Sequence, residues 1–284
     1  MKFSLILATI GRSEEPQRFL AALLVQTHPD YELILIDQNT DDRVERSLSP
    51  FSNQFPIVYI KTHFHGLSRA RNLGLSYASG DIVGFPDDDC WYPPQLLAQV
   101  NAFFESHPNH HGLTVKPVDP LGRKLVNQAS DRSCKIHRRN VLGYGKSISY
   151  CNFLRTVVTQ TIGCFDESLG VGAGTPWEAG EETDYLLRAM NANYALYHCP
   201  DFSVHHPRKS LASPPERLHR ALTYSRGSGR AIRKNGFPVW TIVMLSGKVL
   251  LASLYRLVFQ QDGLSVRVAV TRIQGLIVGW SAKP

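Results

Sequence analysis

Short apolar runs alternate with helical patterns through the first half of the chain. Four runs have the composition of buried strands: residues 3–9 (FSLILAT), 31–37 (YELILID), 57–62 (IVYIKT) and 81–86 (DIVGFP). Three segments have apolar residues at helical intervals, and the last opens with two prolines, as the first turn of a helix tolerates: residues 14–26, 67–78 and 93–107. This alternation predicts right-handed crossovers and an α/β fold with a mostly parallel sheet flanked by helices.

Carboxylates follow two of these apolar runs directly. Asp37 ends the second run, and Asp87, Asp88 and Asp89 follow the fourth in GFPDDDCWYPP. Ligands of parallel sheets bind at the carboxyl ends of the strands, so both groups lie on the predicted binding edge. Adjacent like charges repel one another unless a cation neutralises them, and carboxylate oxygens suit Mg²⁺ or Mn²⁺. The alternatives are a solvated acidic turn for the triplet and a helix cap or turn for Asp37.

Two common nucleotide-binding motifs are missing from the sequence. The turn after the first run, ATIGRSEEP, lacks the GxGxxG fingerprint, and GxxxxGK[ST] occurs nowhere in the chain. These patterns disfavour a dehydrogenase and a P-loop enzyme. They favour a nucleotide whose diphosphate is held through a divalent ion on the aspartates.

Charge divides the chain near residue 207. Residues 208–284 contain thirteen Lys or Arg and two acids, a net charge of +11, whereas residues 1–207 carry −4. We therefore predict one domain over residues 1–207 and a basic helical region over residues 208–284 that meets an anionic surface. Five cysteines without a CxxC pair, and an N-terminal apolar stretch too short for a signal peptide, favour reduced thiols in the cytosol.

Two apolar segments in the basic region, residues 239–259 and 264–281, are about long enough to be considered as membrane spans. The first carries Lys248 and Arg256, and the second carries Arg267 and Arg272. A cation near the centre of a span costs roughly 2.5–3.5 kcal/mol. The pattern therefore predicts an interfacial or re-entrant helix pair rather than two clean spans. The alternative is a soluble helical subdomain.

Four motifs resemble, in order and spacing, those of family 2 glycosyltransferases with the GT-A fold: LILATIGR, ELILIDQNTDD, GLSRARNLGLSYASGDIVGFPDDD and GEETDYLLR. The resemblance covers about residues 2–207. It implies a Rossmann-like sheet, a nucleotide-diphosphate sugar donor (commonly a UDP-sugar), Mn²⁺ or Mg²⁺ as a metal cofactor, and inversion at the anomeric carbon.

The resemblance also implies roles for individual residues. The implied donor-binding positions are Thr9, Gly11, Arg12, Asp37, Arg71, Asn72, Asp87 and Asp88. Asp37 corresponds to the aspartate that binds the base, and Asp87 and Asp89 to the acids of the DxD motif, with Asp89 the direct metal ligand. Such enzymes often supply a late histidine to the metal or diphosphate, so His205 or His206 is expected to complete the metal site. The alternative is an ordinary polar strand end.

GEETDYLLR contains the position of the family's general base, usually an aspartate, which is Glu182 here. The longer side chain moves the carboxylate by about one bond length, and the rate depends steeply on the geometry of a base. We predict Glu182 as the base, supported by Glu181, with Asp184 as a weaker candidate. Acidic residues also suit the first turn of a helix without any catalytic role.

The sequence as a whole predicts an inverting, metal-dependent hexosyltransferase. Its expected acceptor is a glycan or lipid-linked hydroxyl in surface polysaccharide synthesis at the cytoplasmic face of the membrane. One alternative is a sugar-phosphate nucleotidylyltransferase, which would carry a glycine-rich loop that ATIGRSEEP lacks. Another is a catalytically silent, membrane-bound assembly partner with a GT-A-like body. A nucleic-acid partner is not expected, because apolar runs interrupt the basic tail. Residues 117–150 match no motif.

Overall fold

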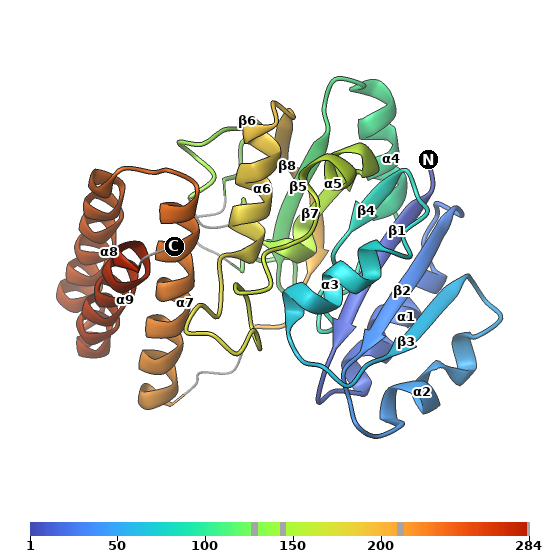
Figure 1. Cartoon of the computed structure of the whole chain (residues 1–284), viewed down its shortest axis with the longest axis horizontal. Coiled ribbons are helices and arrows are strands. Elements are labelled where there is room, and N and C mark those ends of the chain that lie inside the picture. Colours follow the sequence, from blue (N-terminus) through green and yellow to red (C-terminus); the bar gives the residue numbers. More distant parts are fainter. Residues whose placement is uncertain (126–129, 143–145, 209–212, 283–284) are drawn as a thin grey trace. The chain divides into compact units, whose positions relative to one another are not determined.

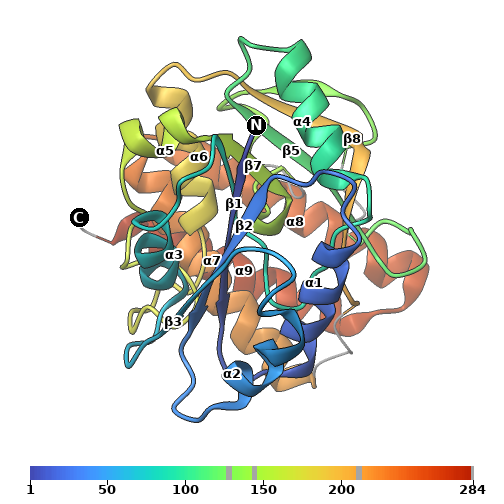
Figure 2. The same ribbon diagram turned by 90° about the vertical axis from the view of Figure 1, so that its right-hand side faces the viewer.

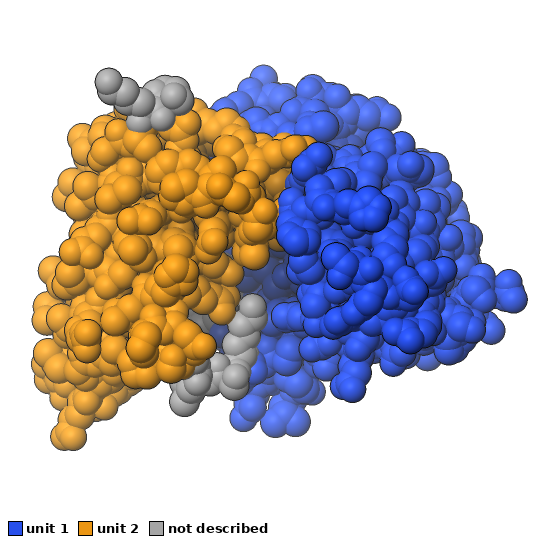
Figure 3. Space-filling view, turned by 60° about the horizontal axis from the view of Figure 1, so that its bottom comes forward, with its two compact units in different colours: residues 1–65, 69–164, 186–208 blue, residues 66–68, 165–185, 209–284 orange. Residues whose placement is uncertain are grey.

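The computed structural model describes residues 1–125, 130–142, 146–208 and 213–282. The chain forms two compact units. Unit 1 comprises residues 1–65, 69–164 and 186–208, and unit 2 comprises residues 66–68, 165–185 and 209–284 (Figure 3). Residues 209–212 and 283–284 of the predicted basic region lie outside the described residues.

Unit 1 contains an eight-stranded mixed sheet in the order β3-β2-β1-β4-β7-β5-β8-β6. Its strands are β1 (Phe3–Thr9), β2 (Tyr31–Asp37), β3 (Ile57–Lys61), β4 (Ile82–Gly84), β5 (Gly112–Val118), β6 (Cys134–Ile136), β7 (Asn152–Arg155) and β8 (Leu196–His205). The pairs β3–β2, β2–β1, β1–β4 and β5–β8 are parallel, and the other pairs are antiparallel. The predicted mostly parallel α/β sheet is confirmed.

Helices cover both faces of this sheet. Figure 2 shows α1 (Glu14–Leu24) and α4 (Leu96–Ser106) on one side, and α3 (Leu67–Leu75) and α5 (Thr156–Ile162) on the other. The remaining short helices of the first half are α2 (Arg43–Leu48) and the 3₁₀ turns Ser49–Phe51 and Ser149–Cys151. Successive strand residues point to opposite faces, and helices cover both faces, so β1 and β2 are apolar at most positions. The buried polar pair Ser4 and Glu32 interrupts the two runs and is joined by a hydrogen bond.

The core of unit 1 follows this period of two. Leu5 and Leu7 of β1 pack in one cluster with Phe19 of α1 and Val100 of α4. On the other face, a Cβ at Gly74 of α3 would lie 2.3 Å from Ile6, so the glycine lets α3 approach β1 closely.

Several helix boundaries differ from the predicted ones, and α1 ends at Leu24 instead of residue 26. Pro93 and Pro94 precede α4 instead of opening it, because the Leu96 N–H bonds the Pro93 carbonyl in a turn and the helix begins at Leu96. Helix α3 ends at Leu75, and Ser76, Tyr77 and Ala78 continue as a turn.

Unit 2 contains the loop Phe165–Gly180, the first turn of α6 (Glu181–Asn191), and the helices α7 (Pro214–Lys234), α8 (Val239–Gln260) and α9 (Gly263–Ser281). Helix α7 begins with a capping box, in which the Ser213 N–H donates to Glu216 at 2.8 Å. Helix α9 packs against both α7 and α8 (Figure 1). Gly275 and Gly279 allow the α7–α9 approach, since a Cβ at either would collide with the α7 backbone.

Helix α8 is long and apolar enough to cross a membrane by length and composition, and it is the one such helix among the described residues. Only 11% of its most apolar 18-residue stretch is buried. The described C-terminal region folds as the helices α7, α8 and α9, which confirms its predicted helical character.

Candidate active site

Three neighbouring parallel strands bring the predicted donor-binding residues to one edge of the sheet in unit 1. Thr9 at the end of β1 lies opposite Asp37 at the end of β2. Ala8 forms a parallel bridge with Asp87, which follows β4. The predicted meeting of Asp37 and the aspartate triplet at the carboxyl ends of the strands is thus present in the structure.

Asp88 faces the loop after β1. Thr9 donates its hydroxyl proton to Asp88 at 2.8 Å, and Arg12 Nη1 donates to the other carboxylate oxygen at 2.7 Å. Burial raises the pKa of Asp88 to about 6, although the Arg12 charge and the Thr9 hydrogen bond oppose the rise. Asp88 therefore ties the loop containing Thr9 and Arg12 to the end of β4.

Asp89 lies between an arginine and a histidine. Its carboxylate oxygens lie 2.8 Å from Arg12 Nη1 and 2.9 Å from His206 Nε2. Burial favours a higher pKa for Asp89, but the hydrogen bonds and charges of His206 and Arg12 outweigh it and hold the pKa well below its usual range. Asp89 is thus an ionised carboxylate in a mostly buried position.

Asp87 pairs with a buried arginine of α3. Arg71 Nη2 lies 3.2 Å from Asp87, and the Arg71 side chain is 1% exposed. Asn72 follows Arg71 on α3 and is half-buried. The three aspartates therefore each have a neighbouring cation, which offsets their mutual repulsion. The side chains of Asp88 and Asp89 are only 13% and 10% exposed, unlike those of a solvated turn.

Asp87, Asp89 and His206 form a cluster that could hold a metal ion. One potential ligand atom from each lies within 4.8 Å of the others. The Nδ1 atom of His206 lies 2.7 Å from the Pro207 carbonyl oxygen, which can only accept, so Nδ1 carries a proton. Nε2, which donates to Asp89 without a metal, would be the ligand atom once a metal ion displaces its proton. The His206 ring also stacks on Tyr150, at 4.9 Å between centroids. Two carboxylates and one oriented imidazole fit a divalent ion such as Mn²⁺.

His205 lies outside this cluster. Its ring stacks on Trp91 at 5.3 Å between centroids, and its Nδ1 lies 3.1 Å from the Asp119 carbonyl oxygen. The two histidines predicted as alternative ligands thus have different surroundings, and the structure groups only His206 with Asp87 and Asp89.

We expect His206→Ala to weaken Mn²⁺ binding at least about tenfold, because it removes the one nitrogen ligand of the cluster. The matched control is His205→Ala, which removes the adjacent imidazole and should leave Mn²⁺ affinity unchanged. Calorimetric titration of both full-length variants with Mn²⁺ in the presence of UDP measures the difference. Equal losses in the two variants would remove His206 from the metal site.

Asp37 is fully buried and organises its own loop. Its Oδ1 accepts from the backbone and side-chain nitrogens of Asn39, at 2.9 and 2.6 Å, and its Oδ2 accepts from the Tyr59 hydroxyl at 2.8 Å. Asn39 in turn accepts from the Gly11 N–H at 2.7 Å. Gly11 has φ +73°, a conformation that favours glycine. Asp37 therefore connects the loop after β2 to the loop after β1.

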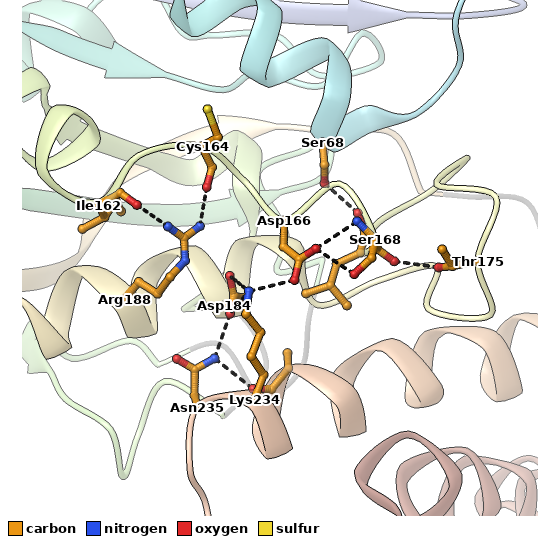
Figure 4. A network of polar contacts seen from close by, with 12 residues as sticks. Ser68, Ile162, Cys164, Asp166, Ser168, Thr175, Asp184, Arg188, Lys234 and Asn235 are labelled. Atoms are coloured by element: carbon orange, nitrogen blue, oxygen red, sulfur yellow. Dashed lines mark hydrogen bonds and ion pairs between the residues drawn. The ribbon is translucent and has the colours of Figure 1, made fainter. Parts of the chain in front are cut away.

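The predicted base and its neighbour begin α6, in unit 2. Glu181 is 4% exposed, and a Cβ at Gly170 would lie 3.1 Å from its carboxyl carbon. Glu182 is half-buried. Asp184, the weaker candidate, is fully buried, and its carboxylate accepts from Lys234 at 3.1 Å and from Asn235 at 2.9 Å (Figure 4). Asp184 thus links the first turn of α6 to the end of α7.

The sequence profile described as Glycosyl transferase family 2 matches residues 4–157, which is more than half of the chain. The chain belongs to glycosyltransferase family 2. An uncharacterized family relative, a glycosyltransferase of Haemophilus influenzae, is 31% identical over 249 residues, which cover 78% of this chain and 75% of that protein. The predicted family is confirmed.

A second relative has a more specific name. The UDP-Glc:alpha-D-GlcNAc-diphosphoundecaprenol beta-1,3-glucosyltransferase WfgD of Escherichia coli is 26% identical over 105 residues, covering 37% of this chain and 42% of WfgD. The chain spans only 20% and 43% of two further glycosyltransferase relatives, from Rickettsia conorii and Nostoc.

Solved structures of similar fold cover nearly the whole chain. The mannosyltransferase PcManGT from Pyrobaculum calidifontis, in complex with GDP-Man and Mn²⁺, has a TM-score of 0.67 at 13% identity, covering 98% of this chain and 86% of PcManGT. S. aureus TarS 1-349 in complex with UDP-GlcNAc has a TM-score of 0.64 at 18% identity, covering 98% of this chain and 79% of that chain. At these identities the likeness establishes the fold, and the predicted GT-A fold is confirmed.

Several residues that contact Asp37, Asp89 or His206 were not singled out by the sequence analysis. Asn39 and Tyr59 hold Asp37, Tyr150 stacks on His206, and Arg18 donates to the Asp89 carbonyl oxygen at 2.8 Å. Asn39 lies in the quoted motif ELILIDQNTDD, two residues after Asp37, where a side-chain turn was a usable signal. Tyr150 belongs to the segment without a motif, and no pattern in the sequence relates it to His206.

Proposed function

We propose that this family 2 glycosyltransferase transfers a sugar from a nucleotide-diphosphate donor to an acceptor hydroxyl, with inversion at the anomeric carbon. The observation that carries the proposal is the cluster of Asp87, Asp89 and His206 at the carboxyl edge of the sheet. It lies beside the loop that Thr9 and Arg12 connect to Asp88. A parallel sheet binds its ligand at this edge.

The donor residues have distinct proposed roles. Asp89, Asp87 and His206 hold Mn²⁺ or Mg²⁺, which when bound neutralises negative charge on the leaving diphosphate. Thr9, Gly11 and Arg12 form the loop that lines the nucleotide. The remaining proposed donor contacts are Asp37 toward the base, the α3 pair Arg71 and Asn72, and Asp88 near the ribose or sugar. Arg12 and Arg71 pair with Asp88 and Asp87, so two guanidinium groups lie beside the proposed position of the diphosphate.

Glu182 is the proposed general base, with Glu181 in support. Inversion by a single displacement requires one group that removes the proton of the acceptor hydroxyl as it attacks the anomeric carbon. A glutamate provides the same carboxylate oxygen as the aspartate usual in the family. The proposed catalytic domain is residues 1–207 and the proposed membrane region is residues 208–284.

The proposed donor is a UDP-sugar, and the proposed acceptor is a glycan or a lipid-linked sugar in surface polysaccharide synthesis. Two comparisons support this choice. TarS is in complex with UDP-GlcNAc, and the printed name of WfgD specifies UDP-Glc and a diphosphoundecaprenol-linked acceptor.

A donor screen tests the proposal. The full-length protein is incubated with UDP-, GDP- and dTDP-sugars, with Mn²⁺ or with a chelator, and release of the nucleoside diphosphate is measured. We expect release from one donor class, dependent on the metal. Release of pyrophosphate from a nucleoside triphosphate and a sugar phosphate would identify a nucleotidylyltransferase instead. Donor binding without any release, with acceptors supplied, would favour the silent assembly partner.

The exposed face of α8 supports membrane attachment. Large apolar side chains are exposed along it, including Leu251 at 69%, Val258 at 67% and Phe259 at 71%. Lys248 lies about 60° from Leu251 around the helix, so a bilayer surface with anionic head groups fits both the apolar and the basic residues. We propose that α8 lies in the interface at the cytoplasmic face of the membrane, near a lipid-linked acceptor.

We expect the full-length double variant Leu251→Glu/Val258→Glu to lose at least about a hundredfold in membrane partition, since burying each side chain is worth about 1.5–3 kcal/mol. The matched control is Leu121→Glu/Val25→Glu, which makes the same changes at exposed positions of unit 1 (74% and 57% exposed). Flotation with vesicles containing anionic lipid measures the bound fraction. Equal flotation of both double variants would remove α8 from the contact.

A further inference from the structure

Helix α7 contacts the segment that carries the proposed base at two separate places, both inside unit 2. The first contact lies at the end of α7, where Lys234 and Asn235 reach Asp184 (Figure 4). The second lies near the middle of α7, where Gly227 meets Ala179 and Gly180. The segment between these contacts is short and contains Glu181 and Glu182.

The first contact is a buried polar network. The carboxylate of Asp184 is fully buried, and Lys234 Nζ lies 3.1 Å from it and 2.8 Å from Asp166. Asn235 donates to Asp184 at 2.9 Å. Burial favours a higher pKa for Asp166, but the hydrogen bonds from Lys234 and Ser168 outweigh burial, and the net effect lowers the pKa of Asp166 to about 2. One ammonium of α7 therefore bridges an acid of the loop and an acid of α6.

The second contact joins two stretches of backbone. A Cβ at Gly180 would lie 2.7 Å from the Gly227 carbonyl oxygen, and a Cβ at Gly227 would collide with the Ala179 carbonyl. Gly180 also has φ +93°, which side chains disfavour. Only glycine at both positions lets the backbones of α7 and of the residue before α6 come this close.

The loop before α6 bounds the same segment on another side. Ser68 donates its hydroxyl proton to the Leu169 carbonyl at 2.6 Å. The next residue, Gly170, packs against the Glu181 carboxyl group so closely that a Cβ there would lie 3.1 Å from the carboxyl carbon. The start of α6 is thus held by α7 and by this loop. The first turn of a helix lacks part of the helix's own hydrogen bonding and tends to fray without such partners.

We propose that Gly227 and Lys234 of α7, together with Asn235 directly after it, are positioning residues for the reaction. They hold the first turn of α6 so that the carboxylate of Glu182 keeps its place toward the acceptor. A base displaced by about 1 Å can lose roughly a hundredfold in rate. This inference rests on the proposed function, because it takes Glu182 as the base. It also extends the catalytic part of the chain past residue 207, to at least Asn235.

The test compares two α7 variants with matched controls in the full-length protein. Lys234→Met removes the bridging ammonium, and Lys135→Met makes the same change at an exposed lysine of β6. Gly227→Ala adds a methyl group against Ala179, and Gly247→Ala adds one on α8, where a Cβ meets no atom within 4 Å. Asn235→Ala is the milder variant that replaces Lys234→Met if the latter does not fold.

Hydrogen exchange and steady-state kinetics are both measured. We expect faster amide exchange over residues 179–185 in the α7 variants, a kcat at least about tenfold lower, and an unchanged KM for the donor. Lys234→Arg keeps both ion pairs and should restore most of kcat. The two controls should match the wild type in both measurements.

Three results would count against the positioning role, and a fourth would refute the proposed function. Faster exchange over residues 179–185 with an unchanged kcat would overturn the positioning role, and so would unchanged exchange in every α7 variant. An equal rise in donor KM and fall in kcat would indicate a general loss of structure and would likewise overturn it. If the wild-type protein neither binds nor transfers any donor, the proposed function itself is refuted. The donor screen detects this outcome before any variant is made.

Discussion

Replacing Asp89 with asparagine is expected to lower sugar transfer by roughly a thousandfold. Asp89 is the member of the Asp87–Asp89–His206 cluster whose carboxylate faces both His206 and Arg12. Its pKa is held low, so the native side chain offers an anionic oxygen, whereas an amide offers a neutral one. Metal-dependent binding of UDP should be lost in parallel with transfer.

The control for this variant is Asp201→Asn, the same change at an exposed position of β8. Thermal unfolding and calorimetry with UDP, each with and without Mn²⁺, separate a loss of metal from a loss of fold. Because Asp89 lies at the rim of the sheet and outside the apolar core cluster, we expect the variant to stay folded. An unchanged UDP affinity in the presence of Mn²⁺ would contradict the metal assignment of Asp89.

Glu182→Gln is expected to lower kcat by about 10²–10⁴-fold with donor binding unchanged. The amide keeps the size of the side chain but cannot accept the acceptor's proton. Glu182→Asp, which restores the residue usual in the family, should keep measurable activity. Steady-state kinetics with a saturating acceptor measures kcat, and calorimetry measures the affinity for the donor.

Glu105→Gln is the matched control, since Glu105 is exposed on α4 in unit 1. Near-normal turnover in Glu182→Gln would transfer the role to Glu181. Asp184 would be a poor replacement, because its buried carboxylate is already bound by Lys234 and Asn235. Substituting Asp184 would disturb the start of α6, so a loss of turnover in that variant would not show that Asp184 accepts a proton.

The C-terminal region emerges with two proposed tasks. The exposed apolar residues of α8 suit a membrane surface, whereas α7 contacts the segment that begins α6. A truncation before α7 would remove both at once. Substitutions in the full chain, such as Leu251→Glu on α8 and Lys234→Met on α7, separate attachment from catalysis.

The sequence predicted the β3-β2-β1-β4 half of the sheet well, for a definite reason. Strands β1, β2 and β4 are buried on both faces or nearly so, and such strands are mostly apolar runs that need no partner to be recognised. In the other half, the sequence indicated only β8, through the strand-like run YHCPDFSVHH. Strand β6 has three residues and β7 four, and β5 contains Pro117. Their pairing depends on partners far away in the chain, as when Gly112 of β5 lies opposite Leu196 of β8.

The sequence by itself determined the family, the strands that end in carboxylates, and the acidic start of α6, because these are local patterns of residue type. Tertiary structure decided which groups meet. Successive residues at a strand end point in opposite directions, so only folding distinguishes His206, beside Asp89, from His205, on Trp91. Likewise, Asp184 and Lys234 are fifty residues apart, and no periodicity relates them. Their pairing exists because burying a carboxylate in α6 requires a cation, and packing of α7 brings that cation within reach.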